Sequence, residues 1–303
     1  MPRDHGSREI VVGVDGSSSS DSAVQWAARE ADLRDLTLHL VHVVTPLTAP
    51  GAAWSDALMP ATYARNAEER AYEIVEKARV IATAATTASS CTPQVDVEVL
   101  YGAVTATLID LSEQSAMIVT GCLGVGSEPG TLLGPVGSNL VRHARCPVAI
   151  VHDELDWCSS APVLVGVDGS GSTDVALEIA FEAASTRRVD LIALHAWTDL
   201  SPLDVPRLDS SPTEWSALES REEAALVTRL APWEEHFPSV VVRPMVVCDR
   251  PIPRLLQEAT DSQLVVVGGH ARDGFAGMWL GSVSSTVARL ARVPVIIARN
   301  SGS

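Results

Sequence analysis

Aromatic residues are scarce in this chain of 303 residues, because phenylalanine, tryptophan and tyrosine together make up only 4% of it. Hydrophobic residues nevertheless account for 46%, so the apolar cores must rest on valine, isoleucine, leucine and alanine. This composition favours buried parallel strands that are covered by alanine-rich helices. The length suggests about two domains, since a domain usually has roughly 100–200 residues.

Positive charge is also in short supply, with 22 lysine and arginine residues against 38 aspartate and glutamate residues. The formal net charge is -16, and the sequence pI is about 4.8. An acidic surface repels the phosphates of nucleic acids and anionic lipid headgroups, so we expect no nucleic-acid partner and no membrane partner. A bound nucleotide would have to be held by local backbone N–H groups.

The five cysteines are scattered and form no C-x-x-C pair, so the sequence supports neither a disulfide framework nor a zinc site. The first ten residues lack the apolar core of a signal peptide. No apolar run approaches the roughly 18 residues that a membrane-spanning helix needs. These absences predict a reduced, soluble, cytoplasmic protein without a metal site.

The chain repeats itself in three ordered segments. Residues 10–17 return as residues 163–170, residues 38–43 as 191–196, and residues 142–148 as 289–295. A polar stretch from His152 to Ala161 lies between the copies and has the composition of a linker. The repeat predicts two domains, residues 1–153 and 160–303.

Within each copy, short apolar runs alternate with helical patterns. Strict β–α alternation predicts a five-stranded parallel sheet with right-handed crossovers, hence two tandem flavodoxin-like or Rossmann-like α/β domains. In the second copy a long connection rich in proline and aspartate is expected around residues 199–215. In the first copy, strands are expected at 10–15, 37–44, 95–100, 116–120 and 146–151, and helices at 20–34, 66–88, 104–114 and 137–144.

An Asp-Gly-Ser turn follows the first strand of each copy, at Asp15 and at Asp168. In open α/β sheets, ligands bind beyond the carboxyl ends of the strands, where an aspartate can accept hydrogen bonds from a ribose or a base. The alternative is that the turn only reverses the chain and caps a helix.

A glycine-rich loop follows the fourth strand of each copy and precedes a helix, over residues 119–138 and 267–284. Glycines let the backbone approach a phosphate closely, and a helix start adds free N–H groups and a positive dipole end. Neither loop is a Walker A motif, and no G-x-G-x-x-G follows the first strand. A G-x-S-x-G nucleophile elbow is missing as well.

The two loops and the two aspartates resemble the universal stress proteins, in particular the tandem-domain type of mycobacteria and related actinobacteria. That family's ATP-binding pattern is G-x-x-G, nine residues, then G-[ST]. Gly121, Gly124 and Gly134 match it in the first copy, and Gly268, Gly281 and Ser282 match it in the second. The resemblance runs from Ile10 to Ala298 and implies an adenine nucleotide alpha hydrolase-like fold that binds ATP, with Mg²⁺ as a possible companion.

The resemblance also implies which residues touch the nucleotide. The glycine and aspartate at the end of each first strand would contact adenosine, the main chain at Val43 or Ala196 would meet adenine, and the loops and helix starts would surround the phosphates. In the first copy these residues are Gly13, Asp15, Val43, Gly121, Cys122, Leu123, Gly124, Val125, Gly126, Ser127, Gly134, Pro135 and Val136. In the second they are Gly166, Asp168, Ala196, Gly268, Gly269, His270, Ala271, Arg272, Asp273, Gly274, Gly281, Ser282, Val283 and Ser284.

Each copy departs from the family pattern at one position. Pro135 stands where the family has serine or threonine; it suits a first helical turn but offers a phosphate neither a hydroxyl nor an N–H. Ala271 replaces the second glycine of the other loop, where its methyl group would crowd a ligand. The second copy adds Arg272, which could pair with a phosphate. The two sites are therefore not equivalent.

Three further residues near the sites have alternative interpretations. His42 and His195 end the second strands, where we expect structural hydrogen bonds in preference to ligand contacts. Cys122 is expected to be a small loop residue, the alternative being a redox sensor whose thiolate is stabilised by the helix start.

The expected function is nucleotide-dependent regulation of stress response or growth with little or no catalysis, because the loops lack a P-loop lysine and an obvious general base. The alternatives are a slow Mg²⁺-dependent ATPase or phosphotransferase, and an interaction module whose sites are empty. The family commonly pairs domains through its last strands, and the resemblance implies a homodimer.

Overall fold

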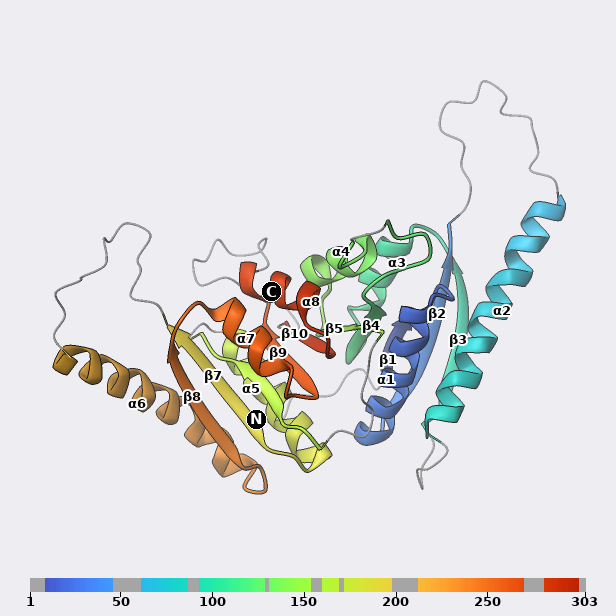
Figure 1. Ribbon diagram of the computed structural model, residues 1–303. Helices are drawn as coiled ribbons and strands as arrows, with labels where there is room; N and C mark the ends of the chain where they lie inside the picture. Colours follow the sequence, from blue (N-terminus) through green and yellow to red (C-terminus); the bar gives the residue numbers. More distant parts are fainter. Residues whose placement is uncertain are drawn as a thin grey trace. The chain divides into compact units, whose positions relative to one another are not determined.

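The computed structural model describes residues 9–45, 61–86, 93–128, 131–153, 160–168, 172–197, 212–269 and 281–299. The chain divides into two compact units, unit 1 over residues 1–153 and unit 2 over residues 154–301. Each unit is an α/β domain whose strands alternate with helices (Figure 1).

Unit 1 contains five strands and four helices in its described residues. The strands are β1 (Glu9–Gly13), β2 (Thr37–Val44), β3 (Val95–Tyr101), β4 (Met117–Gly121) and β5 (Val148–Val151). The helices are α1 (Ser18–Arg34), α2 (Ala61–Thr86), α3 (Val104–Leu111) and α4 (Pro135–His143).

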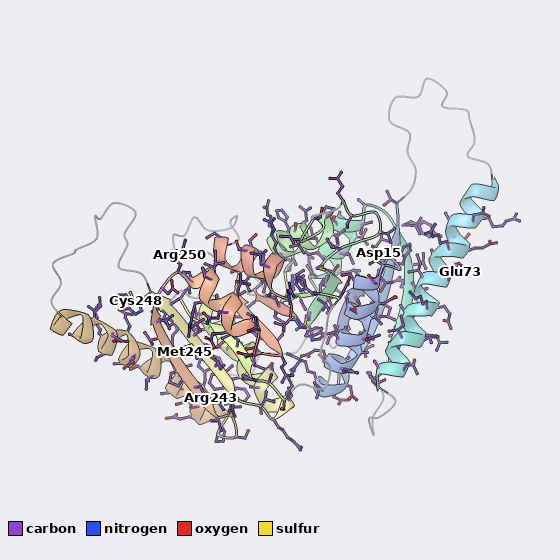
Figure 2. All side chains as sticks on the ribbon, in the orientation of Figure 1. Asp15, Glu73, Arg243, Met245, Cys248 and Arg250 are labelled. Carbon is purple, nitrogen blue, oxygen red and sulfur yellow. The ribbon has the colours of Figure 1, made fainter. Side chains whose placement is uncertain are left out.

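Unit 2 repeats this order. Its strands are β6 (Val163–Gly166), β7 (Leu191–Trp197), β8 (Val242–Cys248), β9 (Leu264–Gly268) and β10 (Val295–Ala298). Its helices are α5 (Ser172–Arg187), α6 (Pro212–His236), α7 (Pro251–Ala259) and α8 (Ser282–Leu290). Figure 2 labels Arg243, Met245 and Cys248 along β8, the edge strand of this unit.

The strand order is β3-β2-β1-β4-β5 in unit 1 and β8-β7-β6-β9-β10 in unit 2, and every one of these neighbouring pairs is parallel. The chain moves outward from β1 through β2 to β3 and then returns to β4 on the other side of β1. Since crossovers are right-handed, α1 and α2 cover one face of the sheet, and α3 and α4 cover the other. The sequence-based fold class is confirmed.

The core is built from short aliphatic side chains, as the composition predicts. The β1, β4 and β5 strands of unit 1 are almost wholly buried, and the equivalent β6, β9 and β10 of unit 2 are too. Phe181 is the one aromatic residue among the largest fully buried side chains of the described residues, and it stacks on Trp233 and Phe237. Three of the few aromatic residues thus pack together in unit 2.

Several helix bounds differ from the sequence-based prediction. Helix α2 begins at Ala61, whereas the sequence predicts a start at residue 66. Its first turn shows no apolar periodicity, so the sequence pattern did not reveal that turn. Helix α3 ends at Leu111 instead of residue 114, and the Ser112 hydroxyl donates to the carbonyl of Ile109 there. Helix α4 begins at Pro135, and α6 begins at Pro212, inside the expected long connection.

Candidate functional site

The candidate site of unit 1 lies where the strand order reverses, beyond the carboxyl ends of β1 and β4. Open α/β sheets bind ligands at this switch point. A cavity of about 300 Å³ opens there. Its wall is formed by residues 13–15, Ser20, residues 41–43, Val104, Leu108, residues 120–127 and residues 134–137.

The structure brings together all of the site residues that the sequence predicts in unit 1. Gly13, Asp15 and Val43 line the cavity, as do residues 121–127 and residues 134–136. The prediction missed Val104 and Leu108, which add apolar wall from α3. The one signal for them was position, since α3 begins directly beyond the carboxyl end of β3.

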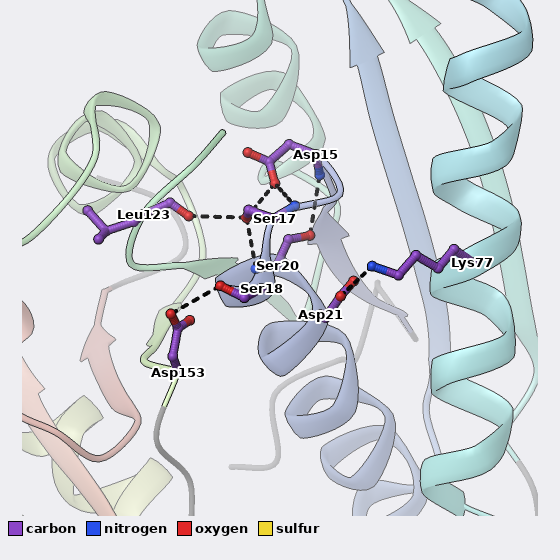
Figure 3. Close-up of polar contacts among 8 residues, drawn as sticks. All are labelled: Asp15, Ser17, Ser18, Ser20, Asp21, Lys77, Leu123 and Asp153. Carbon is purple, nitrogen blue, oxygen red and sulfur yellow. Dashed lines mark hydrogen bonds and ion pairs between the residues drawn. The ribbon is translucent and has the colours of Figure 1, made fainter. Parts of the chain in front are cut away.

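The Asp-Gly-Ser turn both caps α1 and reaches the glycine-rich loop. Ser17 is the N-cap residue, and its hydroxyl oxygen accepts the N–H of Ser20 at 3.1 Å. One carboxylate oxygen of Asp15 accepts the N–H of Ser17 at 3.0 Å and its O–H at 2.7 Å (Figure 3). Gly16 has a φ of 84°, which favours glycine at this turn. The turn therefore does cap a helix, through Ser17.

The other carboxylate oxygen of Asp15 forms a hydrogen bond with the glycine-rich loop. It accepts the backbone N–H of Val125 at 2.8 Å, across 110 residues of sequence. Inside the loop, the N–H of Gly124 donates to the Ser127 hydroxyl oxygen at 3.1 Å, and Gly126 has a φ of 80°. Asp15 thus lies between the first turn of α1 and the loop beyond β4.

Two glycines of the loop lie so close to this turn that a side chain would not fit. A Cβ atom on Gly121 would come within 2.6 Å of the carbonyl carbon of Ser19. A Cβ atom on Gly124 would lie 2.8 Å from a carboxylate oxygen of Asp15. The loop backbone therefore closes on the turn without intervening side chains, as the glycine-rich pattern predicts.

The loop leads into the start of α4. Gly134 is the N-cap residue of this helix, and Pro135 occupies the first turn. The N–H of Gly134 donates to the carbonyl of Cys122 at 2.7 Å. Since proline has no N–H, the N–H groups of Val136 and Gly137 are the ones that the helix start turns toward the cavity. Pro135 thus lies in the first helical turn, although the sequence predicts that the helix begins at residue 137.

Structural hydrogen bonds of both histidines match the prediction. His42 and His195 each place Nδ1 2.7 Å from the carbonyl oxygen of the residue before the aspartate, Val14 and Val167 respectively. A carbonyl oxygen can only accept, so Nδ1 carries the proton in both cases. His42 also lines the cavity, whereas His195 is buried with Nε2 3.4 Å from a carboxylate oxygen of Glu222.

Cys122 is a small residue of the loop and not a stabilised thiolate. Its side chain is buried, and burial raises the pKa of the thiol above its ordinary value. The Ser19 hydroxyl, 3.4 Å from Sγ, opposes that increase, and the charge of Asp153 adds to it. A raised pKa keeps the thiol protonated near neutral pH, which argues against the redox-sensor alternative.

The cavity wall carries one carboxylate, that of Asp15, and within the described residues it contains neither lysine nor arginine. Groups of three or more metal-binding side chains are likewise absent from the described ranges. Donors to an anion would therefore be backbone N–H groups and hydroxyl groups. None of the described helices is long and apolar enough to cross a membrane.

The site of unit 2 is described only in part. His270, Ala271, Arg272, Asp273 and Gly274 lie outside the described residues. Asp168 accepts a hydrogen bond from the Thr173 hydroxyl at 2.7 Å. Gly166 is the last residue of β6, and Ala196 lies within β7.

The helix start of unit 2 differs from that of unit 1. Gly281 is the N-cap residue of α8, which begins at Ser282 and continues through Val283 and Ser284. The Ser284 hydroxyl is buried and donates to the carbonyl of Gly268. The hydroxyl proton of Ser284 therefore forms a hydrogen bond within the protein. Gly269 follows with its N–H 2.9 Å from the carbonyl oxygen of Ala298.

Comparison with protein families gives one match for each unit. The model described as "Universal stress protein family" matches residues 6–152 and residues 160–299. A universal stress protein of Mycobacterium tuberculosis is 49% identical over 300 residues, which cover 96% of this chain and 94% of the relative. Another from the same species is 44% identical over 305 residues, with 99% of each chain covered.

Solved structures show the same fold at lower identity. A universal stress protein of Archaeoglobus fulgidus matches with a TM-score of 0.67 and 19% identity, covering 97% of this chain and 98% of that chain. A putative universal stress protein of Pseudomonas aeruginosa matches with a TM-score of 0.58 and 17% identity, over 98% and 95% of the two chains.

Proposed function

The chain belongs to the universal stress protein family, and we propose that it binds adenine nucleotide in unit 1 and acts through the occupancy of that site. The observation that carries this proposal is the cavity at the switch point of the sheet. Its wall combines glycine backbone, one aspartate, a helix start and apolar side chains in a single space.

The apolar part of the wall suits a base. Val41, Val43, Val104 and Leu108 surround one part of the cavity. Flat apolar groups bind in such pockets, while a few polar groups fix their orientation. His42 supplies such a polar group, because its Nδ1 proton is committed to Val14 and leaves Nε2 as an acceptor in the neutral ring.

The polar part of the wall suits a ribose and phosphates. The Asp15 carboxylate is an acceptor for sugar hydroxyls. The N–H groups of Gly124 and Gly134 already donate to Ser127 and Cys122, so the backbone at Gly126 and the first N–H groups of α4 are the donors that suit phosphates, because phosphates bind at helix starts. The residues present therefore fit ATP, and a Mg²⁺ ion carried with it would reduce the repulsion from Asp15.

We propose little or no catalysis for this site. The wall offers no lysine or arginine to a transferring phosphoryl group in its described residues, and Pro135 removes a hydroxyl at the start of α4. Phosphoryl transfer depends on such cationic groups. A slow Mg²⁺-dependent ATPase remains the second candidate, and metal-dependent turnover of ATP above background would favour it.

We propose the location and the partners of the protein on chemical grounds. The acidic charge and the absence of paired cysteine motifs suit a cytoplasmic regulator that binds neither nucleic acid nor membrane. Family resemblance suggests a homodimer. For unit 2 we propose a second nucleotide site, formed around Asp168, Gly268 and the start of α8.

A cavity-filling variant tests the unit 1 site. Val104→Trp puts an indole into the wall, while Ala106→Trp adds the same group to an exposed position of the same helix. ATP binding by calorimetry should fall at least tenfold for unit 1 in Val104→Trp and stay within about twofold of wild type in Ala106→Trp. Equal ATP affinity in the two variants would refute the assignment of the cavity.

A further inference from the structure

Ser17 contacts both the first turn of α1 and the loop beyond β4. Its hydroxyl accepts from Ser20, donates to Asp15 at 2.7 Å and lies 3.3 Å from the carbonyl oxygen of Leu123 (Figure 3). Leu123 is 106 residues away in the sequence. Ser17 is absent from the cavity wall in the part of the chain that the structure describes.

Two neighbouring side chains complete this connection. The Ser19 hydroxyl oxygen accepts the N–H of Leu123 at 3.3 Å, and Asp15 accepts the N–H of Val125 at 2.8 Å. We call Asp15, Ser17 and Ser19 the loop clamp. Together its members hold both backbone groups of Leu123 and the N–H of Val125, immediately before the left-handed Gly126.

From Leu123 to Val125, the hydrogen bonds that attach the loop to the first turn of α1 are those of the clamp. The Val125 side chain is 64% exposed, so apolar packing contributes little to holding the loop at that point. The hydrogen bonds of residues 124–127 among themselves close the turn but do not attach it to the sheet. A loop that must present N–H groups to a phosphate needs a fixed backbone, because affinity is lost when binding has to order it.

We propose that Ser17 is a positioning residue of the nucleotide site, which sets the affinity of unit 1 by holding Asp15 and the loop without touching the ligand. This inference rests on the proposed nucleotide binding. It adds a residue that the family's glycine and aspartate pattern does not contain.

The substitution Ser17→Gly isolates this role. Glycine is a good N-cap residue, so α1 keeps nearly all of its stability, but the hydroxyl that donates to Asp15 and lies 3.3 Å from the carbonyl oxygen of Leu123 is gone. Ser17→Thr keeps a hydroxyl and serves as the conservative rescue. Ser18→Gly is the matched control, because the exposed Ser18 hydroxyl donates to Asp153 at 3.2 Å and to no residue of the loop.

Cys122 supplies a readout that is specific for unit 1. The residue is 6% exposed and lines the cavity, so alkylation mapped by peptide mass spectrometry reports how often the loop opens. In nucleotide-free protein, Ser17→Gly should raise the alkylation rate of Cys122 about three- to tenfold, the range expected for one lost hydrogen bond. Wild type, Ser17→Thr and Ser18→Gly should agree within twofold.

The same readout measures affinity when ATP is added. The ATP concentration that half-protects Cys122 should rise about three- to tenfold in Ser17→Gly and return toward wild type in Ser17→Thr. An unchanged alkylation rate in nucleotide-free Ser17→Gly would overturn the clamp, whether or not ATP binds. A faster rate with no protection of wild type by ATP would support the clamp and refute the proposed function instead.

Discussion

The two units share one strand order and differ at the helix that follows the glycine-rich loop. Both histidines contact the carbonyl oxygen of the residue before the aspartate at 2.7 Å, and both aspartates follow the ends of equivalent strands, β1 and β6. At the helix start, however, unit 1 has Pro135 and Gly137, while unit 2 has Ser282 and a buried Ser284. The strand ends at the proposed base and ribose side are thus more alike than the helix starts at the proposed phosphate side.

This comparison separates what the fold requires from what a ligand requires. The strand register, the histidine contact and an ion pair between the first two helices recur in both units, as Lys77–Asp21 at 2.5 Å and Arg229–Asp174 at 2.9 Å. At the described helix starts, Pro135 and Gly137 of unit 1 are replaced by Ser282 and Ser284 in unit 2. We infer that the duplicated fold is intact in both units and that their affinities for nucleotide differ.

The largest expected effect comes from Gly121→Ala. Its Cβ atom would lie 2.5–2.7 Å from the Ser19 hydroxyl, carbonyl carbon and carbonyl oxygen, so α1 or the loop must move. We expect the free energy of unfolding of unit 1 to fall by about 2–3 kcal/mol. Thermal and urea unfolding measure it. Gly126→Ala is the control, since open space surrounds that position and only its φ of 80° is strained, at about 1 kcal/mol. A larger loss in the control would contradict the close contact.

A smaller effect should follow when equivalent residues are exchanged between the units. A Cβ atom on Gly269 would lie 2.8 Å from the carbonyl oxygen of Ala298, whereas unit 1 holds Cys122 at that position. Gly269→Cys should destabilise unit 2 by about 1–3 kcal/mol. Cys122→Gly should cost unit 1 only about 1 kcal/mol, from lost burial and greater chain entropy. Equal losses in urea unfolding would show that the units pack alike here.

Exchange at the helix start should change affinity more than stability. Pro135→Ser restores a hydroxyl and an N–H at the first turn of α4, and we expect ATP to bind unit 1 about fivefold more tightly. Ser282→Pro should weaken the proposed site of unit 2 by a similar factor. Calorimetry with ATP measures both variants. If neither variant changes the affinity, the helix starts do not distinguish the two sites.

The smallest effect is expected for the recurrent ion pair. Lys77 is 53% exposed in its pair with Asp21, and Asp174 is 58% exposed in its pair with Arg229. Exposed pairs contribute about 0.2–1 kcal/mol, so Lys77→Ala and Arg229→Ala should each shift unfolding by less than about 1 kcal/mol. High salt should remove most of the difference from wild type. A loss that persists in salt would mean that packing of these side chains matters instead.

The sequence predicts the fold well because its strands are compact aliphatic runs closed by turn residues. Gly13, Asp15, Val43 and the loop glycines could be assigned to one edge of the sheet, since parallel strands bring their carboxyl ends together. The loop clamp could not be predicted. Ser17 and Leu123 meet only through the tertiary packing of α1 against β4, and a serine after Asp-Gly predicts nothing more than a helix cap.

The apolar wall from α3 was missed for a similar reason. Val104 and Leu108 follow the helical period that any core residue follows, and only the path of the chain from β3 back to β4 turns them toward the cavity. Residues 270–280, which include Ala271 and Arg272, lie outside the described residues. The expected effect of these two residues on unit 2 therefore stays a prediction.

The central claim is that unit 1 holds adenine nucleotide, and the most direct test is the amount of nucleotide released per chain. Protein purified mildly, then denatured and analysed by chromatography, should release adenine nucleotide close to one per chain or more. Val104→Trp should lower that amount, and Ala106→Trp should not. Protein that releases no nucleotide, and that takes up none after incubation with ATP and Mg²⁺, would contradict the account.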